Sequence, residues 1–223
     1  MSPVPNVATG HALGIFGAGA SGREVAWLAE TCLGAGAGIT FIVDQPELAG
    51  RMVNGFPAVH IDEFAKQSSG TPVCVAVGDP ADRERCVRAC SSLGLQFISL
   101  VHPRAETSRW VSIGEGTIVC AGSILTTNVD IGRHVHVNIG CTISHDATIG
   151  DYSTLSPGVH IAGWVTLGRR VFLGTGANVI NGSAERRLHI GDDAIVGAGA
   201  CVIADVAAGE TVVGVPAAPL PRR

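Results

Sequence analysis

Aliphatic residues recur every six positions through the second half of the chain. Helical side chains repeat every 3.6 residues and strand side chains every two, so neither period alone produces six. A coil of three short strands, with a turn at each corner, does produce it. The pattern therefore predicts a parallel β-helix with three hexads in each coil and aliphatic columns that point inward. The twelve consecutive hexad positions are Ile113, Val119, Leu125, Ile131, Val137, Ile143, Ile149, Leu155, Ile161, Leu167, Leu173 and Val179.

The phase of this repeat slips once, after Val179. The next inward aliphatic is Ile190, eleven residues further on, so five residues are inserted at about 183–187, which read SAERR. The repeat then resumes through Val196 and Val202. We expect the insertion to leave the β-helix as a loop at one corner.

The first half of the chain has a different rhythm, in which apolar runs alternate with helical patterns. Such alternation is typical of a parallel sheet with covered faces. The fold class is therefore a small Rossmann-like parallel α/β domain, residues 1–103, followed by a β-helix domain, residues 104–223. We expect strands over 12–16, 40–44, 72–78 and 96–101, and helices over 23–33 and 82–93.

Composition excludes several classes of protein. The net charge is −4 and no long basic run occurs, which argues against nucleic acid or an anionic membrane as the main partner. No run of about 18 apolar residues exists, so no membrane span is expected, and the start lacks the features of a signal peptide. The seven cysteines are scattered without a CxxC motif, which is typical of reduced thiols in a cytoplasmic protein.

Four short motifs together resemble a known family. The hexad array carries His-Asp at 145–146, Ala-Gly at 162–163 and Gly-Val-Pro-Ala at 214–217. In this it resembles the left-handed β-helix acyltransferases. The Gly-rich segment GAGASGREV at 17–25 narrows the resemblance to sugar acetyltransferases of the sialic-acid and bacillosamine type. The resemblance implies acetyl-CoA as co-substrate, no metal, a homotrimer, and a UDP-, dTDP- or GDP-linked amino sugar as acceptor in polysaccharide or glycan synthesis.

His145 is the candidate general base of such a reaction. It lies two residues after the inward Ile143, which places it at or near a corner, and the same column holds Gly163 one coil later. A glycine beside the histidine leaves a notch with a bare N–H, which a thioester carbonyl could approach and which could stabilise an oxyanion. Histidine titrates near neutrality, so it suits removal of a proton from an amine or hydroxyl.

Two residues are candidates for orienting His145. Asp146 stands at the position the family uses, and a neighbouring carboxylate would raise the basicity of the imidazole. Adjacent strand residues point to opposite faces, so a direct contact with Asp146 requires a corner conformation. Asn138 stands at another position that the family uses, and both alternatives remain open.

The resemblance also indicates where acetyl-CoA would bind. Relatives that acetylate UDP-linked 4-amino sugars carry a second histidine nine residues after the catalytic one, and here that position is Thr154. In the insertion, Arg186 and Arg187 carry guanidinium groups suited to phosphate, although a solvated surface loop is an equal alternative. The expected acetyl-CoA residues are Thr154, Ser156, Ala162, Gly163, Asn181, Arg186 and Arg187.

The glycine-rich loop predicts the acceptor site. Its G-x-G-x-x-G spacing between a strand and a helix matches a dinucleotide fingerprint, but the domain is too short for two mononucleotide-binding halves. The resemblance implies a nucleotide-activated sugar instead, with its phosphates at the helix N-terminus. Alternatively, the glycines only allow close packing of helix on strand. The expected acceptor residues are Gly17, Gly19, Ser21, Gly22, Arg23, Asp44, Gly78 and Asp79.

Three other functions share parts of this pattern. The same base would serve a sugar O-acetyltransferase acting on sialic acid, and a non-catalytic β-helix scaffold is a further alternative. The β-helix carbonic anhydrases need two histidines five residues apart, and no pair here has that spacing. His134, His136 and His160 could line the same cleft as His145. We expect the face with His134, His136 and His145 to be exposed and covered only by trimer formation.

Overall fold

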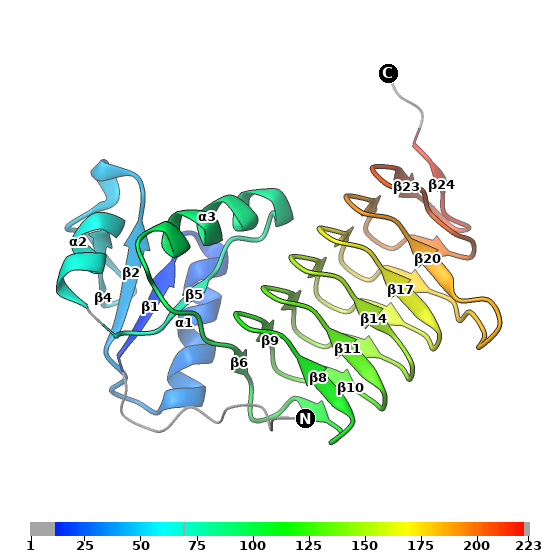
Figure 1. Ribbon diagram of the computed structural model, residues 1–223, viewed down its shortest axis with the longest axis horizontal. Coiled ribbons are helices and arrows are strands. Elements are labelled where there is room, and N and C mark those ends of the chain that lie inside the picture. The colour runs from blue at the N-terminus through cyan, green and yellow to red at the C-terminus, as the bar shows by residue number, and fades with distance from the viewer. Residues whose placement is uncertain (1–11, 69, 221–223) are drawn as a thin grey trace.

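The computed structural model describes residues 12–68 and 70–220. The expected absence of a signal peptide concerns residues 1–11, which lie outside the described residues. The chain forms a small α/β layer followed by a long stack of β coils (Figure 1). This is the predicted fold class, a Rossmann-like parallel α/β unit and a left-handed parallel β-helix.

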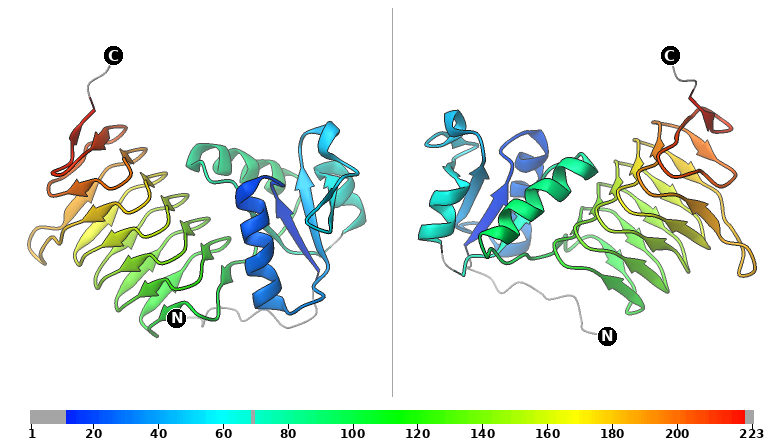
Figure 2. Two further views of the ribbon diagram at one scale, coloured as in Figure 1. Left: turned by 180° about the vertical axis from the view of Figure 1, so that it is seen from behind. Right: turned by 45° about the horizontal axis from the view of Figure 1, so that its top comes forward.

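The N-terminal sheet has five strands in the order β3-β4-β2-β1-β5, all parallel except β3. α1 buries Val25 and Leu28 against one face of this sheet, while α2 and α3 bury Phe64 and Val87 against the other (Figure 2). The elements are β1 (Leu13–Phe16), α1 (Ala20–Leu33), β2 (Ile39–Val43), the 3₁₀ turn η1 (Pro46–Leu48), β3 (Met52–Val53), β4 (Phe56–His60), α2 (Ile61–Gln67), β5 (Val73–Val75) and α3 (Pro80–Ser92).

The expected fourth strand of this sheet, 96–101, is wrong. Phe97 makes a single bridge to Val73, and the chain then leaves the sheet, so that Leu100–Val101 (β6) pairs with the β-helix instead. The sheet is filled at its other edge by the β3–β4 hairpin, which the sequence analysis missed. Its signal was Asn54-Gly55, whose φ angles of 49° and 87° suit a tight hairpin turn.

The β-helix has three sheets, which we number in the order in which each coil visits them. The first contains β6 (Leu100–Val101), β9 (Ile118–Val119), β12 (His136–Val137), β15 (Thr154–Leu155), β18 (Phe172–Leu173), β21 (Ile195–Val196), β23 (Thr211–Val213) and the antiparallel β24 (Ala218–Pro219). The second contains β7 (Glu106–Thr107), β10 (Ile124–Leu125), β13 (Thr142–Ile143), β16 (His160–Ile161), β19 (Asn178–Val179) and β22 (Cys201–Val202). The third contains β8 (Val111–Ile113), β11 (Val129–Ile131), β14 (Thr148–Ile149), β17 (Val165–Leu167) and β20 (Leu188–Ile190).

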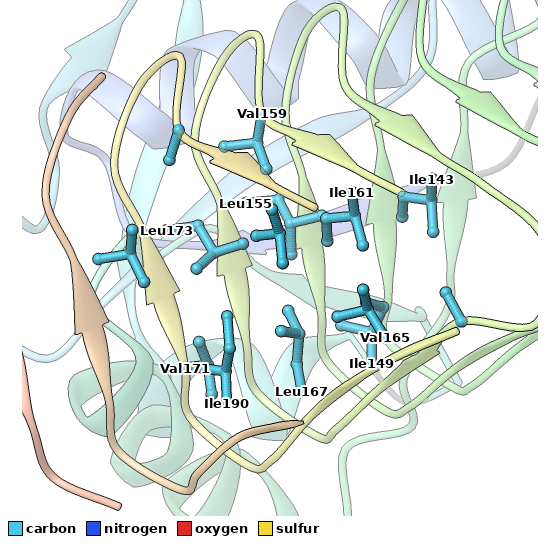
Figure 3. Packing of buried hydrophobic residues seen from close by; sticks show 14 of the residues in the cluster. Ile143, Ile149, Leu155, Val159, Ile161, Val165, Leu167, Val171, Leu173 and Ile190 are labelled. Carbon is cyan, nitrogen blue, oxygen red and sulfur yellow. The ribbon is translucent and has the colours of Figure 1, made fainter. Parts of the chain in front are cut away.

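The hexad aliphatics form the inward columns that the sequence predicts. Ile143 pairs directly with Ile161 of the next coil, and both are buried in one continuous core (Figure 3). The insertion is also confirmed by the register of the third sheet. Val165 pairs with Leu188, an offset of 23 residues, against 18 between Thr148 and Thr166 one coil earlier. The five extra residues are therefore accommodated without breaking the ladder.

The N-terminal unit covers the first β-helix sheet, and a buried arginine joins the two. Arg83 of α3 is fully buried, and its guanidinium donates to the carbonyls of His134, at 2.8 Å, and Val77, at 2.7 Å. It also donates to the carbonyls of Gly78, Tyr152 and Ser153. Burial lowers the pKa of Arg83 to about 9, so the group remains charged at neutral pH. Its donors thus fix two segments of backbone against each other.

This contact contradicts the expectation that His134 and His136 are exposed. They are only 3% and 5% exposed, because the N-terminal unit of the same chain lies over them. The Nε2 atom of His136 lies 2.9 Å from the carbonyl oxygen of Val75. The ring of His134 packs between Phe97 and Tyr152. Neither histidine is therefore available to a cleft or to a trimer interface.

Candidate active site

His145 and Asp146 lie at the corner between the second and third β-helix sheets. Their position follows from β13, whose inward Ile143 ends two residues before the histidine. Asp146 has a φ of +56°, in the left-handed region that aspartate tolerates better than most residues. This turn brings its carboxylate to the same side as the preceding imidazole. The corner conformation that a direct contact requires is therefore present.

A hydrogen bond of 2.8 Å joins Nδ1 of His145 to Oδ2 of Asp146. The bond from His145, supported by one of 3.1 Å from Asn128, holds the pKa of the Asp146 carboxyl below its usual range. An ionised carboxylate can only accept hydrogen bonds, so Nδ1 must carry the ring proton. The lone pair of Nε2 is then free, and half of the His145 side chain is exposed to solvent. The arrangement is that of an oriented general base.

Gly163 lies directly beside this imidazole, as the column of hexads predicted. A Cβ placed on Gly163 would lie 2.4 Å from Cε1 and 2.6 Å from Nε2 of His145, so only glycine leaves room for the ring. Among the described residues, the Gly163 N–H makes no backbone hydrogen bond. It remains a candidate donor to an oxyanion.

Three of the predicted site residues lie elsewhere on the β-helix. Asn138 and Ser156 occupy the corner between the first and second sheets, where the Asn138 amide donates to the carbonyl of Leu155 at 2.7 Å. Thr154 is buried in the first sheet, and its hydroxyl donates to the carbonyl of Gly78 at 2.8 Å. Within one chain, the structure therefore brings Asp146, and not Asn138, into contact with His145.

The glycines of the N-terminal loop differ in what they do. Gly17 has a φ of +102°, which the turn after β1 requires. A Cβ on Gly22 would lie only 1.9 Å from the carbonyl oxygen of Gly17, so this glycine permits close packing of α1 on the strand. Gly19 differs from both, because a Cβ there would meet no atom within 4 Å. Only Gly19 faces open space at the uncapped N-terminus of α1.

The other predicted acceptor residues surround this helix terminus at the carboxyl edge of the sheet. A Cβ on Gly78 would lie 3.5 Å from the Ser21 hydroxyl, so the loops after β1 and β5 are adjacent. Arg23 and Asp44 are exposed beside them. Asp79 is already used, since its carboxylate accepts from the Asp82 N–H at 2.9 Å and caps α3. The edge thus presents backbone donors, a guanidinium and a carboxylate.

The comparisons with known proteins identify the family. No protein-family model matches the chain. A curated relative, the GDP-perosamine N-acetyltransferase of Escherichia coli O157:H7, is 35% identical over 215 residues, which cover 94% of this chain and 96% of the relative. The chain belongs to the hexapeptide-repeat sugar acetyltransferases. It is an acetyl-CoA-dependent enzyme, as the resemblance implied.

Solved structures support the same assignment. WeeI from Acinetobacter baumannii AYE is 33% identical, with a TM-score of 0.87 over 94% of this acetyltransferase and all of WeeI. A histidine-to-asparagine mutant of perosamine N-acetyltransferase from Caulobacter crescentus, in complex with CoA and GDP-perosamine, is 31% identical. Its TM-score is 0.85 over 95% of this chain and 97% of that one. The likeness therefore extends over both the α/β unit and the β-helix.

Two adjoining hollows lie next to the His145 corner of the acetyltransferase. The first, of about 310 Å³, lies over the second β-helix sheet and is lined by Ser144 and Ala162, which directly precede His145 and Gly163. In it, His160 Nδ1 lies 2.8 Å from the Thr142 hydroxyl. The second hollow, also of about 310 Å³, is lined by Asn181 and Arg186. Both hollows share Ile180, so together they extend away from His145 toward the insertion.

The two arginines of the insertion are placed differently. Arg186 is exposed on the rim of the second hollow. The guanidinium of Arg187 is instead turned back onto the β-helix, where it donates to the Thr166 hydroxyl at 2.8 Å and to the Asp146 carbonyl at 2.5 Å. Both arginines line the second hollow, but the Arg187 guanidinium is engaged by protein groups, whereas Arg186 is exposed.

Two findings concern the described residues alone. No helix within 12–68 and 70–220 is long and apolar enough to cross a membrane. Over the same ranges, no group of three or more histidine, cysteine, aspartate or glutamate residues is placed to hold a metal ion.

Proposed function

We propose that this enzyme acetylates the amine of a nucleotide-activated amino sugar, with His145 as general base. The observation that carries the proposal is the hydrogen bond from His145 Nδ1 to an ionised Asp146, which leaves Nε2 free beside Gly163. The relatives act on or bind GDP-perosamine, which supports a GDP-linked amino sugar as acceptor. Synthesis of a polysaccharide or other glycan would consume such a product.

The proposed reaction needs only one base and one oxyanion donor. The neutral amine attacks the thioester carbonyl of acetyl-CoA while Nε2 of His145 takes the proton that the nitrogen loses. The carbonyl electron pair moves onto oxygen, where the Gly163 N–H can stabilise it. Collapse of this intermediate breaks the carbon–sulfur bond, and the imidazolium returns its proton to the leaving thiolate. The products are the N-acetyl sugar and CoA.

The two substrates would occupy different units of the chain. We assign the acceptor to residues 1–103, with its diphosphate at the N-terminus of α1 near Gly19, Arg23 and Asp44. We assign acetyl-CoA to residues 104–223, with its thioester at Gly163 and its arm along the two hollows. Arg186 would then lie near the phosphates of the adenosine end.

This division leads us to place the active site between subunits of a homotrimer. The acceptor edge rests on the first β-helix sheet through the bond from Thr154 to Gly78. His145 lies at the corner opposite that sheet, so a chain does not bring its own acceptor edge to its own base. A second copy could do so, and exposed Ile124, Ile180 and Ile203 near this corner offer an apolar surface for it.

Mixed oligomers test this assembly directly. His145→Ala chains and chains with a defective acceptor edge, such as Arg23→Glu, would be inactive alone. Trimers that contain both kinds of chain should regain activity, because some interfaces would unite an intact base with an intact acceptor edge. Light scattering that shows a monomer, or mixtures without regained activity, would argue against the shared site.

An acetyl-transfer assay tests the substrate class. Purified enzyme is given acetyl-CoA and, separately, GDP-, UDP- and dTDP-linked amino sugars and sialic acid, and CoA release is measured. The proposal predicts turnover with a nucleotide amino sugar, GDP-perosamine first among them, and an N-acetyl product. Turnover with sialic acid alone would favour the O-acetyltransferase, and turnover with none would contradict the proposed acceptor class.

We place this reaction in the cytoplasm. All seven cysteines are unpaired, which is usual for proteins of a reducing compartment. Burial raises the pKa of most of these thiols, so they remain protonated and serve as small apolar side chains.

A further inference from the structure

The five-residue insertion places one arginine on the outer face of the third β-helix sheet. The insertion closes as a tight turn, in which the Ser183 N–H donates to the Arg186 carbonyl at 2.8 Å. The chain then enters β20, whose Leu188 pairs with Val165 of the previous coil. Arg187 stands just before this strand, so its side chain starts two coils beyond the corner that holds Asp146.

From there the Arg187 guanidinium reaches back across two coils. Its Nε donates to the Thr166 hydroxyl at 2.8 Å, and one terminal nitrogen donates to the Asp146 carbonyl at 2.5 Å. The same nitrogen lies 3.3 Å from the Val165 carbonyl and 3.4 Å from the Thr148 hydroxyl. The guanidinium carbon also lies 5.7 Å from the centre of the Trp164 ring, within cation–π range.

These contacts converge on a corner whose backbone is constrained. Asp146 and Trp164 both have left-handed φ angles, +56° and +60°. Trp164 is a bulky residue, and such a residue is held in that region by its surroundings. The charge-assisted bond to the Asp146 carbonyl ties this peptide to the two following coils. The side chain of Asp146 then projects from a fixed backbone toward His145.

We propose that Arg187 is a positioning residue for the reaction, which holds the Asp146 corner so that its carboxylate can orient His145. The inference rests on the proposed role of His145 as base. From its sequence position, Arg187 was expected to contact the phosphates of acetyl-CoA. The positioning role replaces that expectation, because the Arg187 guanidinium is directed at protein groups. Its positive charge also favours the ionised carboxylate that the hydrogen bond to Nδ1 needs.

Kinetics of Arg187→Ala, Arg187→Lys and the matched control Arg186→Ala test the inference. Arg187→Ala should lower kcat by about 10–100-fold, as expected for a misplaced catalytic group, with the acetyl-CoA KM nearly unchanged. Arg187→Lys should retain only part of the activity that Arg187→Ala loses. The guanidinium bonds the Thr166 hydroxyl and the Asp146 carbonyl through two different nitrogens, and the single nitrogen of an ammonium cannot take both positions. Arg186→Ala should show the reverse split, a raised acetyl-CoA KM with kcat preserved.

Two further measurements separate positioning from general stability. Guanidinium ion added to Arg187→Ala should restore part of kcat, which loss of folded protein alone would not allow. Introduced into the His145→Ala enzyme, Arg187→Ala should cause no further loss of kcat, since it acts through the base. An unchanged kcat in Arg187→Ala, or an effect confined to the acetyl-CoA KM, would overturn the inference.

The His145→Ala enzyme also separates this inference from the proposed function. If it loses activity while Arg187→Ala retains kcat, the base is supported and only the positioning role fails. If it retains activity, the base role fails and the positioning inference fails with it. Thermal unfolding of each variant shows whether the chain is folded, and Arg187→Gln, which keeps a hydrogen-bond donor without the charge, replaces Arg187→Ala if the latter does not fold.

Discussion

The imidazole of His145 lies over Gly163 of the next coil, at a distance that admits no Cβ on the glycine. The φ of Gly163 is not in the left-handed region, so its backbone would accept alanine. The His145 ring supplies the three atoms nearest to such a Cβ, so contact with the ring is a strong steric reason for glycine at this corner. The glycine at position 163 thus determines where the imidazole of the proposed base, His145, can lie.

Replacing Gly163 by alanine should therefore act on the reaction more than on the fold. The new methyl group would push the ring aside, and a displacement of about 1 Å can cost about 10²-fold in rate. We expect kcat to fall while the melting temperature changes little, because His145 is half exposed and can move. The matched control is Gly163→Ala within His145→Ala, where stability should be unaffected. A wild-type kcat for the single variant would show that the ring need not lie over the glycine.

Asp146→Asn should lower kcat without unfolding the corner. Asparagine tolerates the left-handed φ of +56°, so the backbone is preserved, but the amide no longer favours a protonated Nδ1 as the carboxylate does. The loss should be smaller than the roughly 10²–10⁴-fold expected for removal of a general base. Steady-state kinetics check this, with Asn138→Ala in parallel. A larger loss for Asn138→Ala than for Asp146→Asn would shift the orienting role to Asn138.

The two glycines Gly19 and Gly22 give a matched pair for the acceptor site. Gly19→Ala places its methyl group in open space, so stability should be kept while the acceptor KM rises and the acetyl-CoA KM stays the same. Gly22→Ala would press against the Gly17 carbonyl and should destabilise the fold, typically by about 1–3 kcal/mol. Calorimetry and kinetics on both variants check this. An unchanged acceptor KM in Gly19→Ala would indicate that the acceptor does not bind at this helix terminus. Tight NAD binding there would favour a dinucleotide site.

Burial of His134 should make the protein less stable in mild acid. Burial lowers the pKa of His134 to about 4. The His134 imidazole therefore stays neutral in the folded protein at pH values where it is already protonated in the unfolded chain, from about pH 6.5 downward. The unfolded state therefore binds more protons between about pH 6.5 and 4, and the free energy of unfolding falls over this range by up to about 3 kcal/mol.

Urea unfolding of the wild type and His134→Asn between pH 5 and 7 measures this effect. Asparagine accepts the left-handed φ of +53° at this position and does not titrate. We expect the variant to lose packing and therefore absolute stability, but to show a flatter dependence on pH than the wild type. His136, also buried and with a lowered pKa, should leave some of the slope in place. Equal slopes in the two proteins would contradict this account of His134.

The sequence predicted the β-helix and the neighbours of His145 because the repeat is regular. Each hexad fixes which residues point inward, and one coil of offset places Gly163 beside His145 and Asn181 beyond it. The same arithmetic located the insertion after Val179. For Gly22, the structure shows the close packing of helix on strand that the sequence offered only as the alternative to an acceptor site.

What the sequence could not provide lies in contacts between distant segments. No periodic pattern reveals that Arg83 fixes the N-terminal unit over His134 and His136, so these two histidines were expected to be exposed. The left-handed φ of Asp146 is a property of the corner, since Trp164 one coil later shares it, so the partner of His145 stayed open. Phe97 and Leu100 read as one strand, although the chain changes sheets between them.

The central claim is that His145 is the base of acetyl transfer. Its most direct test is the kcat of His145→Ala with saturating acetyl-CoA and GDP-perosamine, measured on protein whose unfolding temperature matches the wild type. The account predicts a kcat lower by on the order of 10²–10⁴-fold, with an unchanged acetyl-CoA KM. A variant that retains most of its activity would mean that the amine reaches the thioester already deprotonated, and the account would be wrong.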